Sequence, residues 1–125
     1  MEKAIIVADD SMIIRNIIEK SIGSEYVVLK ATNGREVVKY IIDKNYDIEG
    51  ILLDLNMPES DGFMVLNYFQ NNNLFKKYPI VIISGDDTKE TIDKAFTYDI
   101  VDMLNKPFSA ENIKVMISKM ITFKN

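Results

Sequence analysis

The sequence predicts an α/β fold in which a doubly wound parallel sheet is flanked by helices. Two observations carry this prediction: five short apolar runs alternate with five segments of helical apolar spacing, and the alternation repeats about every 25 residues. Right-handed crossovers between such runs give a parallel sheet with helices on both faces. No linker, repeat or low-complexity segment interrupts the 125 residues, so one domain is expected over residues 1–125.

The predicted strands are runs rich in Ile, Val and Leu that end at polar or turn-forming residues. Continuous apolar runs of this length are typical of strands buried on both faces. The runs cover residues 4–8, 26–31, 51–54, 79–85 and 100–104, and the last is weaker because Asp102 interrupts it.

The predicted helices lie between these runs, with apolar residues three and four positions apart. Ser11 is suited to cap the first helix and Gly23 to end it, while Ser109 begins the last helix in a capping box with Asn112. The expected core-facing residues are Ile14, Ile17, Ile18 and Ile22, then Val37, Val38, Ile41 and Ile42, then Leu66 and Phe69, then Ile92, Ala95 and Phe96, and finally Ile113, Met116, Ile117, Met120 and Ile121.

Composition excludes several classes of protein. Fifteen Lys and Arg residues against 19 Asp and Glu give a net charge of -4, which disfavours direct binding to nucleic acid or membranes. The absence of cysteine removes thiolate chemistry, and the absence of histidine removes imidazole bases and the phosphodonor role in a phosphorelay. No apolar run is long enough for a signal peptide or a membrane span. We therefore expect a cytoplasmic protein whose partners are proteins or cations.

Asp54 is the first candidate site residue, because it stands at the carboxyl end of a predicted buried strand. In an open parallel sheet that end faces the crevice where ligands bind. The residues that follow are turn-rich: Pro58 cannot continue a ladder, and Asp61-Gly62 is a strong turn pair. Asp54 is therefore expected to be reachable from solvent.

Asp9 and Asp10 follow the first predicted strand and so are expected at the same edge as Asp54. Three carboxylates this close raise one another's pKa unless a cation lies among them. Magnesium suits such a set, because it takes hard oxygen ligands and is usually held by one or two carboxylates. Alternatively, Asp9-Asp10 is only the acidic start of a helix. The presence of Asp54 and Lys106 favours the metal site.

Lys106 and Ser84 stand at the ends of two further predicted strands. A lysine ammonium, a serine hydroxyl and backbone N–H groups near Asn56 can together bind a phosphoryl group. A carboxylate can act as the nucleophile in phosphoryl transfer and form an acyl phosphate. Taken singly, a lysine before a proline is mostly a loop residue and a serine after a strand mostly a helix cap.

Together these motifs resemble the receiver domain of bacterial two-component response regulators, and the resemblance covers essentially the whole chain. The motifs are Asp9-Asp10, the segment Asp54-Leu55-Asn56-Met57-Pro58-Glu59-Ser60-Asp61-Gly62, Ser84, and Lys106-Pro107-Phe108.

The resemblance implies a sheet order of 2-1-3-4-5 and the role of each site residue. Asp54 would accept a phosphoryl group from a histidine kinase or phosphotransfer protein. Asp10, Asp54 and the Asn56 carbonyl would hold Mg²⁺, with Asp9 acting through water. Ser84 and Lys106 would bind the phosphoryl oxygens.

The resemblance also implies how the protein would signal. It would catalyse only its own phosphorylation and dephosphorylation, and it would signal to a downstream protein or output domain through the fourth helix, fifth strand and fifth helix. Because the sequence ends directly after the last predicted helix, we expect either a stand-alone receiver or one separated from its output domain.

Two positions depart from the pattern usual in that family. Gly85 stands where a small alanine is common, and Met103 stands where many members have an aromatic residue. Met103 would therefore have to replace the aromatic side chain as the partner of Ser84 in the switch.

Three other functions remain open from the residues. A flavodoxin-like protein would need a hydroxyl- and glycine-rich phosphate loop where Asp9-Asp10 stands. A phosphatase of the haloacid dehalogenase type would need a second acid at the position of Asn56. A degenerate receiver would act only as a protein-binding module.

Overall fold

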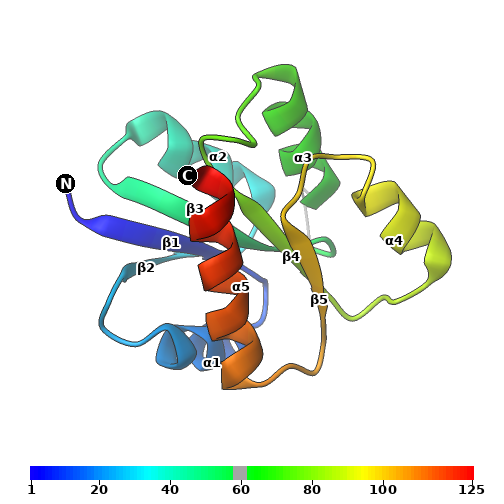
Figure 1. Ribbon diagram of the computed structural model, residues 1–125, viewed down its shortest axis with the longest axis horizontal. Coiled ribbons are helices and arrows are strands. Elements are labelled where there is room, and N and C mark those ends of the chain that lie inside the picture. Colours follow the sequence, from blue (N-terminus) through cyan, green and yellow to red (C-terminus); the bar gives the residue numbers. More distant parts are fainter. Residues whose placement is uncertain (58–61) are drawn as a thin grey trace.

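The computed structural model describes residues 1–57 and 62–125. Within these residues, five parallel strands form one sheet in the order β2-β1-β3-β4-β5, which confirms the predicted fold class and strand order (Figure 1). The strands are β1 (Lys3–Ala8), β2 (Val27–Ala31), β3 (Asp47–Asp54), β4 (Ile80–Ser84) and β5 (Asp102–Asn105). The helices are α1 (Met12–Ile22), α2 (Gly34–Asp43), α3 (Gly62–Asn71), α4 (Lys89–Ala95) and α5 (Ala110–Lys124).

The core has two parts, one on each face of the sheet. Successive side chains of a strand point to opposite faces, so Ile5 and Val7 of β1 pack with α1 and α5. Ala4 and Ile6 of the same strand pack in the other cluster, with α2, α3 and the single buried residue of α4. Both faces of the central strands are covered, which explains why their sequences are apolar without interruption.

The ends of the helices agree with the predicted caps. Ser11 Oγ accepts a hydrogen bond from the Ile14 N–H, and Gly23, with a φ of 76°, ends α1. The side chain of Asn112 accepts a bond from the Ser109 N–H, and Ser109 Oγ accepts one from the Asn112 N–H. These bonds satisfy backbone donors that have no partner within the helix.

Two strands begin more than one residue away from the predicted position. β3 starts at Asp47, because its polar first half pairs with β1 and its acids contact Lys124 Nζ, at 3.9 Å for Asp47 and 3.1 Å for Glu49. β5 starts at Asp102, the residue expected to interrupt it. The Asp102 carboxylate accepts a bond from the Met103 N–H and pairs with Lys119 Nζ at 2.6 Å.

Three residues expected in the core are exposed instead. Ile17 in α1 is 44% exposed, Ile42 in α2 is 60% exposed, and Phe96 after α4 is 50% exposed. Each lies at one side of its apolar stripe. The stripe spans more of the helix circumference than the sheet covers, so residues at its margin remain in solvent.

No helix in the described parts of the chain combines the length and the apolar character that a membrane span requires.

Candidate functional site

Asp9 is held rigidly where β1 ends. Its N–H donates to the Ala31 carbonyl at 3.0 Å, which extends the pairing of β1 with β2 by one residue. Its carboxylate oxygen Oδ1 accepts a hydrogen bond from the Ser11 N–H at 2.9 Å, and its backbone carbonyl accepts one from Arg15 Nη1 at 2.8 Å. The side chain is fully buried. Hydrogen bonds of its N–H, its carbonyl and Oδ1 therefore fix the position of Asp9.

Lys106 follows β5 directly and brings a positive charge to the acids. Its N–H donates to the Ser84 carbonyl at 2.8 Å, which holds the residue beside the end of β4. Its Nζ lies 2.7 Å from Asp9 Oδ2 and 3.5 Å from Asp54 Oδ2. Burial by itself would lower the pKa of Lys106, but the two carboxylates outweigh it and raise the pKa above its usual value. The lysine is thus a fixed positive charge between two acids.

Asp54 ends β3 and is almost fully buried. Its Oδ1 accepts a hydrogen bond from the Asn56 N–H at 3.1 Å. Burial is the main reason that the pKa of Asp54 is raised. The Asp9 charge raises it further, whereas the Asn56 N–H and Lys106 oppose the shift. The positive charge of Lys106 therefore does not fully offset the cost of ionising Asp54 in this buried position.

The acid set fits a divalent cation. Asp9, Asp10 and Asp54 each place a carboxylate oxygen within 4.8 Å of the others. Among the described residues, the buried oxygen Asp9 Oδ2 has no hydrogen bond, so only the ionic contact with Lys106 offsets its charge. Asp10 is exposed, which leaves the cluster open to an ion from solvent. Clustered carboxylate oxygens with room for water match the ligands of Mg²⁺.

Ser84 is the last residue of β4, and its neighbour in the strand, Ile83, is in register with Asp54. Its side chain is completely buried. The hydroxyl is already in use: Oγ accepts a hydrogen bond from the Asp86 N–H at 3.0 Å and donates one to the Asp86 carbonyl at 3.2 Å. Ser84 therefore stands beside the acid cluster but is bonded to the following loop.

The segment after Asp54 is described only in part. Asn56 is exposed, and the Gly62 N–H donates to the Leu55 carbonyl at 2.9 Å. A β-carbon at Gly62 would stand 2.7 Å from the Asp54 carbonyl oxygen, so the start of α3 packs directly against the end of β3. The predicted turn residues Pro58 and Asp61 lie outside the described residues.

Met103 lies in β5 in register with Ile82. It is partly buried and packs against the core cluster to which Ala95 of α4 also belongs. The residue named as the switch partner of Ser84 thus lies on the α4 side of the sheet.

Two residues with direct contacts to the site were not found from the sequence. Arg15 was not singled out as a site residue, and its side chain donates a hydrogen bond to the Asp9 carbonyl. Asp86 was not singled out either, and its backbone groups bond the Ser84 hydroxyl. Both contacts involve backbone groups, whose positions residue types do not reveal.

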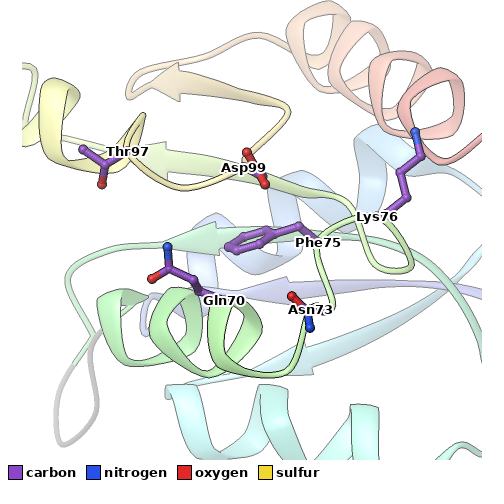
Figure 2. Close-up of a pocket in the computed structure, with 6 residues that line it drawn as sticks. All are labelled: Gln70, Asn73, Phe75, Lys76, Thr97 and Asp99. Atoms are coloured by element: carbon purple, nitrogen blue, oxygen red, sulfur yellow. The ribbon is translucent and has the colours of Figure 1, made fainter.

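A pocket of ≈ 270 Å³ lies at the opposite edge of the sheet, before the amino ends of β4 and β5 (Figure 2). It is lined by Gln70, Asn73, Phe75, Lys76, Thr97 and Asp99. Two of its polar groups are used locally, since Lys76 Nζ donates to the Phe123 carbonyl and Thr97 Oγ1 donates to the Lys94 carbonyl. The acid cluster, not this pocket, is the candidate site.

Comparison with known proteins identifies the family. The sequence pattern of the response regulator receiver domain matches residues 5–118. The chain therefore belongs to the response regulator receiver domain family, the signalling modules of two-component systems. The resemblance inferred from the motifs is confirmed.

Individual relatives support this assignment. Chemotaxis protein CheY1 of Helicobacter pylori strain J99 is 31% identical over 113 residues, which cover 88% of this chain and 90% of that protein. A response regulator receiver domain from Francisella is 27% identical, covers 100% of both chains and superposes with a TM-score of 0.83. The beryllofluoride-activated NtrC4 receiver domain, a dimer, is 25% identical over 98% of both chains, with a TM-score of 0.84.

Several relatives are much longer than this chain. The two-component response regulator-like protein PRR37 of Oryza sativa subsp. indica is 30% identical over 89 residues, which are 71% of this chain but 12% of that protein. The sensor histidine kinase CheAY of Helicobacter pylori matches over 15% of its length. The match to these proteins therefore concerns the receiver module alone.

Proposed function

We propose that residues 1–125 form one receiver domain that accepts a phosphoryl group on Asp54 in a Mg²⁺-dependent reaction. The observation that carries this proposal is Lys106 Nζ between the buried carboxylates of Asp9 and Asp54, with Asp10 beside them. One lysine faces three acids here, so the cluster has an excess of negative charge. An excess of acid at the carboxyl edge of a parallel sheet is suited to a metal and a phosphoryl group.

The proposed reaction is a transfer between two phosphate carriers. A carboxylate oxygen of Asp54 forms a bond to phosphorus, while the bond between phosphorus and the donor's leaving atom breaks and its electrons stay with the donor. The donor is a phosphohistidine of a kinase or phosphotransfer protein, or a small acyl phosphate such as acetyl phosphate. The protein turns over no separate substrate in this scheme.

Each residue of the site would have a separate role in this reaction. Asp10, Asp54 and the Asn56 carbonyl would hold Mg²⁺, and Asp9, which is buried and bonded to the Ser11 N–H, would act on it through water. The bound ion would supply positive charge to the phosphoryl oxygens. Lys106 would exchange its contact with Asp9 for a phosphoryl oxygen, and the Ser84 hydroxyl would donate to another.

The signal would leave through the surface formed by α4, β5 and α5, which a downstream protein or output domain would recognise. The cytoplasmic location expected from the sequence stays a prediction.

Intact-mass analysis tests the proposal directly. The chain incubated with Mg²⁺ and acetyl phosphate is expected to gain one phosphoryl group, and the adduct should be missing in Asp54→Asn and in the presence of a chelator. Asp47→Asn, which changes an acid of the same strand far from the site, is the matched control and should label like the parent. Labelling that persists in Asp54→Asn would place the acceptor elsewhere.

Two other outcomes would favour the alternative functions. Continuous release of phosphate without an adduct would favour a phosphatase, and no labelling by any donor would favour a module used only for binding.

A further inference from the structure

The Ser84 hydroxyl forms a closed pair of hydrogen bonds with one residue. Its oxygen accepts from the Asp86 N–H at 3.0 Å, and its proton goes to the Asp86 carbonyl at 3.2 Å, because a carbonyl cannot donate. Both bonds are to the backbone. The rotamer of a fully buried side chain is thus tied to the position of the Asp86 peptide groups.

A serine hydroxyl has one proton, so Ser84 cannot donate to Asp86 and to a phosphoryl group at once. The bond to the Asp86 carbonyl is longer than the roughly 2.5–3.0 Å usual for a hydroxyl donor. A bond to a phosphoryl oxygen is charge-assisted and about twice as strong as a neutral one. A phosphoryl group on Asp54 is therefore expected to take the Ser84 proton away from Asp86.

The side chain of Asp86 reaches the start of α4. Its Oδ1 accepts from the Thr88 N–H at 2.9 Å, and its Oδ2 accepts from Thr91 Oγ1 at 2.7 Å. Thr88 is the N-cap of α4 and Thr91 lies in its first turn. The Thr88 N–H and the Thr91 hydroxyl lower the pKa of Asp86, so the carboxylate is ionised and remains an acceptor at neutral pH.

α4 packs loosely against the rest of the protein and can therefore move when Asp86 moves. Only one of its seven residues, Ala95, is buried, and Figure 1 shows the helix standing at the margin of the molecule. Gly85, which joins β4 to Asp86, is also not packed against other residues, because a β-carbon at this position would meet nothing within 4 Å. A displacement of Asp86 can therefore move the first turn of α4 without disrupting the core.

We propose that Asp86 is a positioning residue that couples the Ser84 hydroxyl to the first turn of α4. In the free protein its backbone holds Ser84 away from the phosphoryl position while its carboxylate holds Thr88 and Thr91. When Ser84 turns to a phosphoryl group, the Asp86 peptide groups lose their partner, and the carboxylate carries the change into α4. This inference rests on the proposed function, because it requires a phosphoryl group on Asp54.

Asp87 provides a matched control for a test. It is also an acid, it is the next residue in the same loop, and it is exposed with no hydrogen bond or ion pair in the described part of the chain. The test compares parent, Asp86→Ala and Asp87→Ala by amide chemical shifts, in the free form and with Mg²⁺ and beryllofluoride as the phosphoryl analogue. Residues 84–85 report the site, and residues 88–95 report α4.

In the parent and in Asp87→Ala, beryllofluoride is expected to shift the amides of both groups of residues. In Asp86→Ala the shifts at 84–85 should persist while those at 88–95 fall to less than half. Asp86→Asn keeps an oxygen acceptor for the Thr88 N–H and should recover part of the α4 response. Thr91→Val, which keeps the size and shape of the side chain but removes the hydroxyl, should also weaken the response and covers the case in which Asp86→Ala unfolds α4.

An α4 response in Asp86→Ala and Thr91→Val as large as in the parent would overturn the coupling while leaving phosphorylation of Asp54 intact. An equal loss in Asp87→Ala would also overturn it, because general loop charge would then be the cause. A parent that shows no shift at 84–85 and no phosphoryl adduct would overturn the proposed function, and this inference with it.

Discussion

Lys106 is paired more closely with Asp9 than with Asp54. Its Nζ lies 2.7 Å from an Asp9 oxygen and 3.5 Å from an Asp54 oxygen, although Asp54 is the proposed phosphoacceptor. The lysine ammonium thus lies among the same carboxylates that could hold a metal ion. Metal and lysine are expected to compete there, because like charges within a few Å repel each other.

Lys106→Met should therefore have opposite effects on stability and on metal binding. Removal of one partner of a buried ion pair costs about 3–5 kcal/mol, and the 25% exposure of the Lys106 side chain reduces this to roughly 1–3 kcal/mol. The affinity for Mg²⁺ should rise about threefold to tenfold, since a competing charge is gone. Urea unfolding in chelator and calorimetric titration with Mg²⁺ measure the two effects.

Lys119→Met is the control for this prediction. Lys119 also forms a close pair with an aspartate, at 2.6 Å from Asp102, but its side chain is 48% exposed and lies away from the acid cluster. Its loss should cost at most about 1 kcal/mol and leave Mg²⁺ affinity unchanged. A weaker affinity in Lys106→Met than in Lys119→Met would contradict the competition.

Asp10→Ala tests the metal cluster itself. Because a ligand that binds only the folded state stabilises it, Mg²⁺ at about a hundred times its Kd should add about 2.7 kcal/mol to the parent, a rise in Tm of roughly 10 °C. The variant should lose most of this rise. Without metal it should be as stable as the parent or more so, because one repelling charge is gone. Asp43→Ala, an exposed acid at the end of α2, should keep the full Mg²⁺ response.

Glu36→Gln should alter the dependence of stability on pH. The Thr32 hydroxyl and then the Thr32 N–H, each 2.6 Å from Glu36 Oε1, lower the pKa of this carboxyl. A lowered pKa in the folded state stabilises the fold above the unfolded value of about 4.3, and the stabilisation is lost as the pH falls through the folded value.

At pH 7 the substitution should lower the free energy of unfolding by about 0.5 kcal/mol. This is the usual contribution of a hydrogen bond to a charged acceptor, reduced because Glu36 is exposed to solvent. The cost should disappear toward pH 3. Urea unfolding of the parent and the variant at several pH values measures this cost. A cost independent of pH would show that the charge of Glu36 does not contribute to its bonds with Thr32.

Met103→Tyr should sharpen the conformational change. Methionine adapts to irregular gaps through several rotamers of similar energy, so its position follows Ser84 less closely than a ring would. Amide shifts over residues 84–108 with and without beryllofluoride should be larger and closer to two-state in the tyrosine variant. Met103→Ala should leave labelling of Asp54 nearly intact. Equally large, two-state shifts in the parent would show that methionine is an adequate switch.

Residue types and spacing alone predicted how strands and helices alternate along the chain, because each element repeats its apolar side chains with its own period. They also predicted that Asp9, Asp10, Asp54 and Lys106 would meet, since the carboxyl ends of parallel strands share one edge. The first prediction depends on local sequence pattern and the second on a general property of parallel sheets. Neither requires knowledge of a particular side-chain contact.

The tertiary structure decided which of several possible partners each side chain takes. Lys106 could have paired with any of three acids, and its preference for Asp9 depends on where two distant loops place their atoms. The tie between Ser84 and Asp86 depends on backbone groups, which every residue carries alike. Likewise, a β-carbon added at Gly50 would stand 2.5 Å from the Met120 sulfur, so Met120 in the distant helix α5 would have to move. Such contacts join residues far apart in the chain or depend on backbone positions, so no local sequence pattern reveals them.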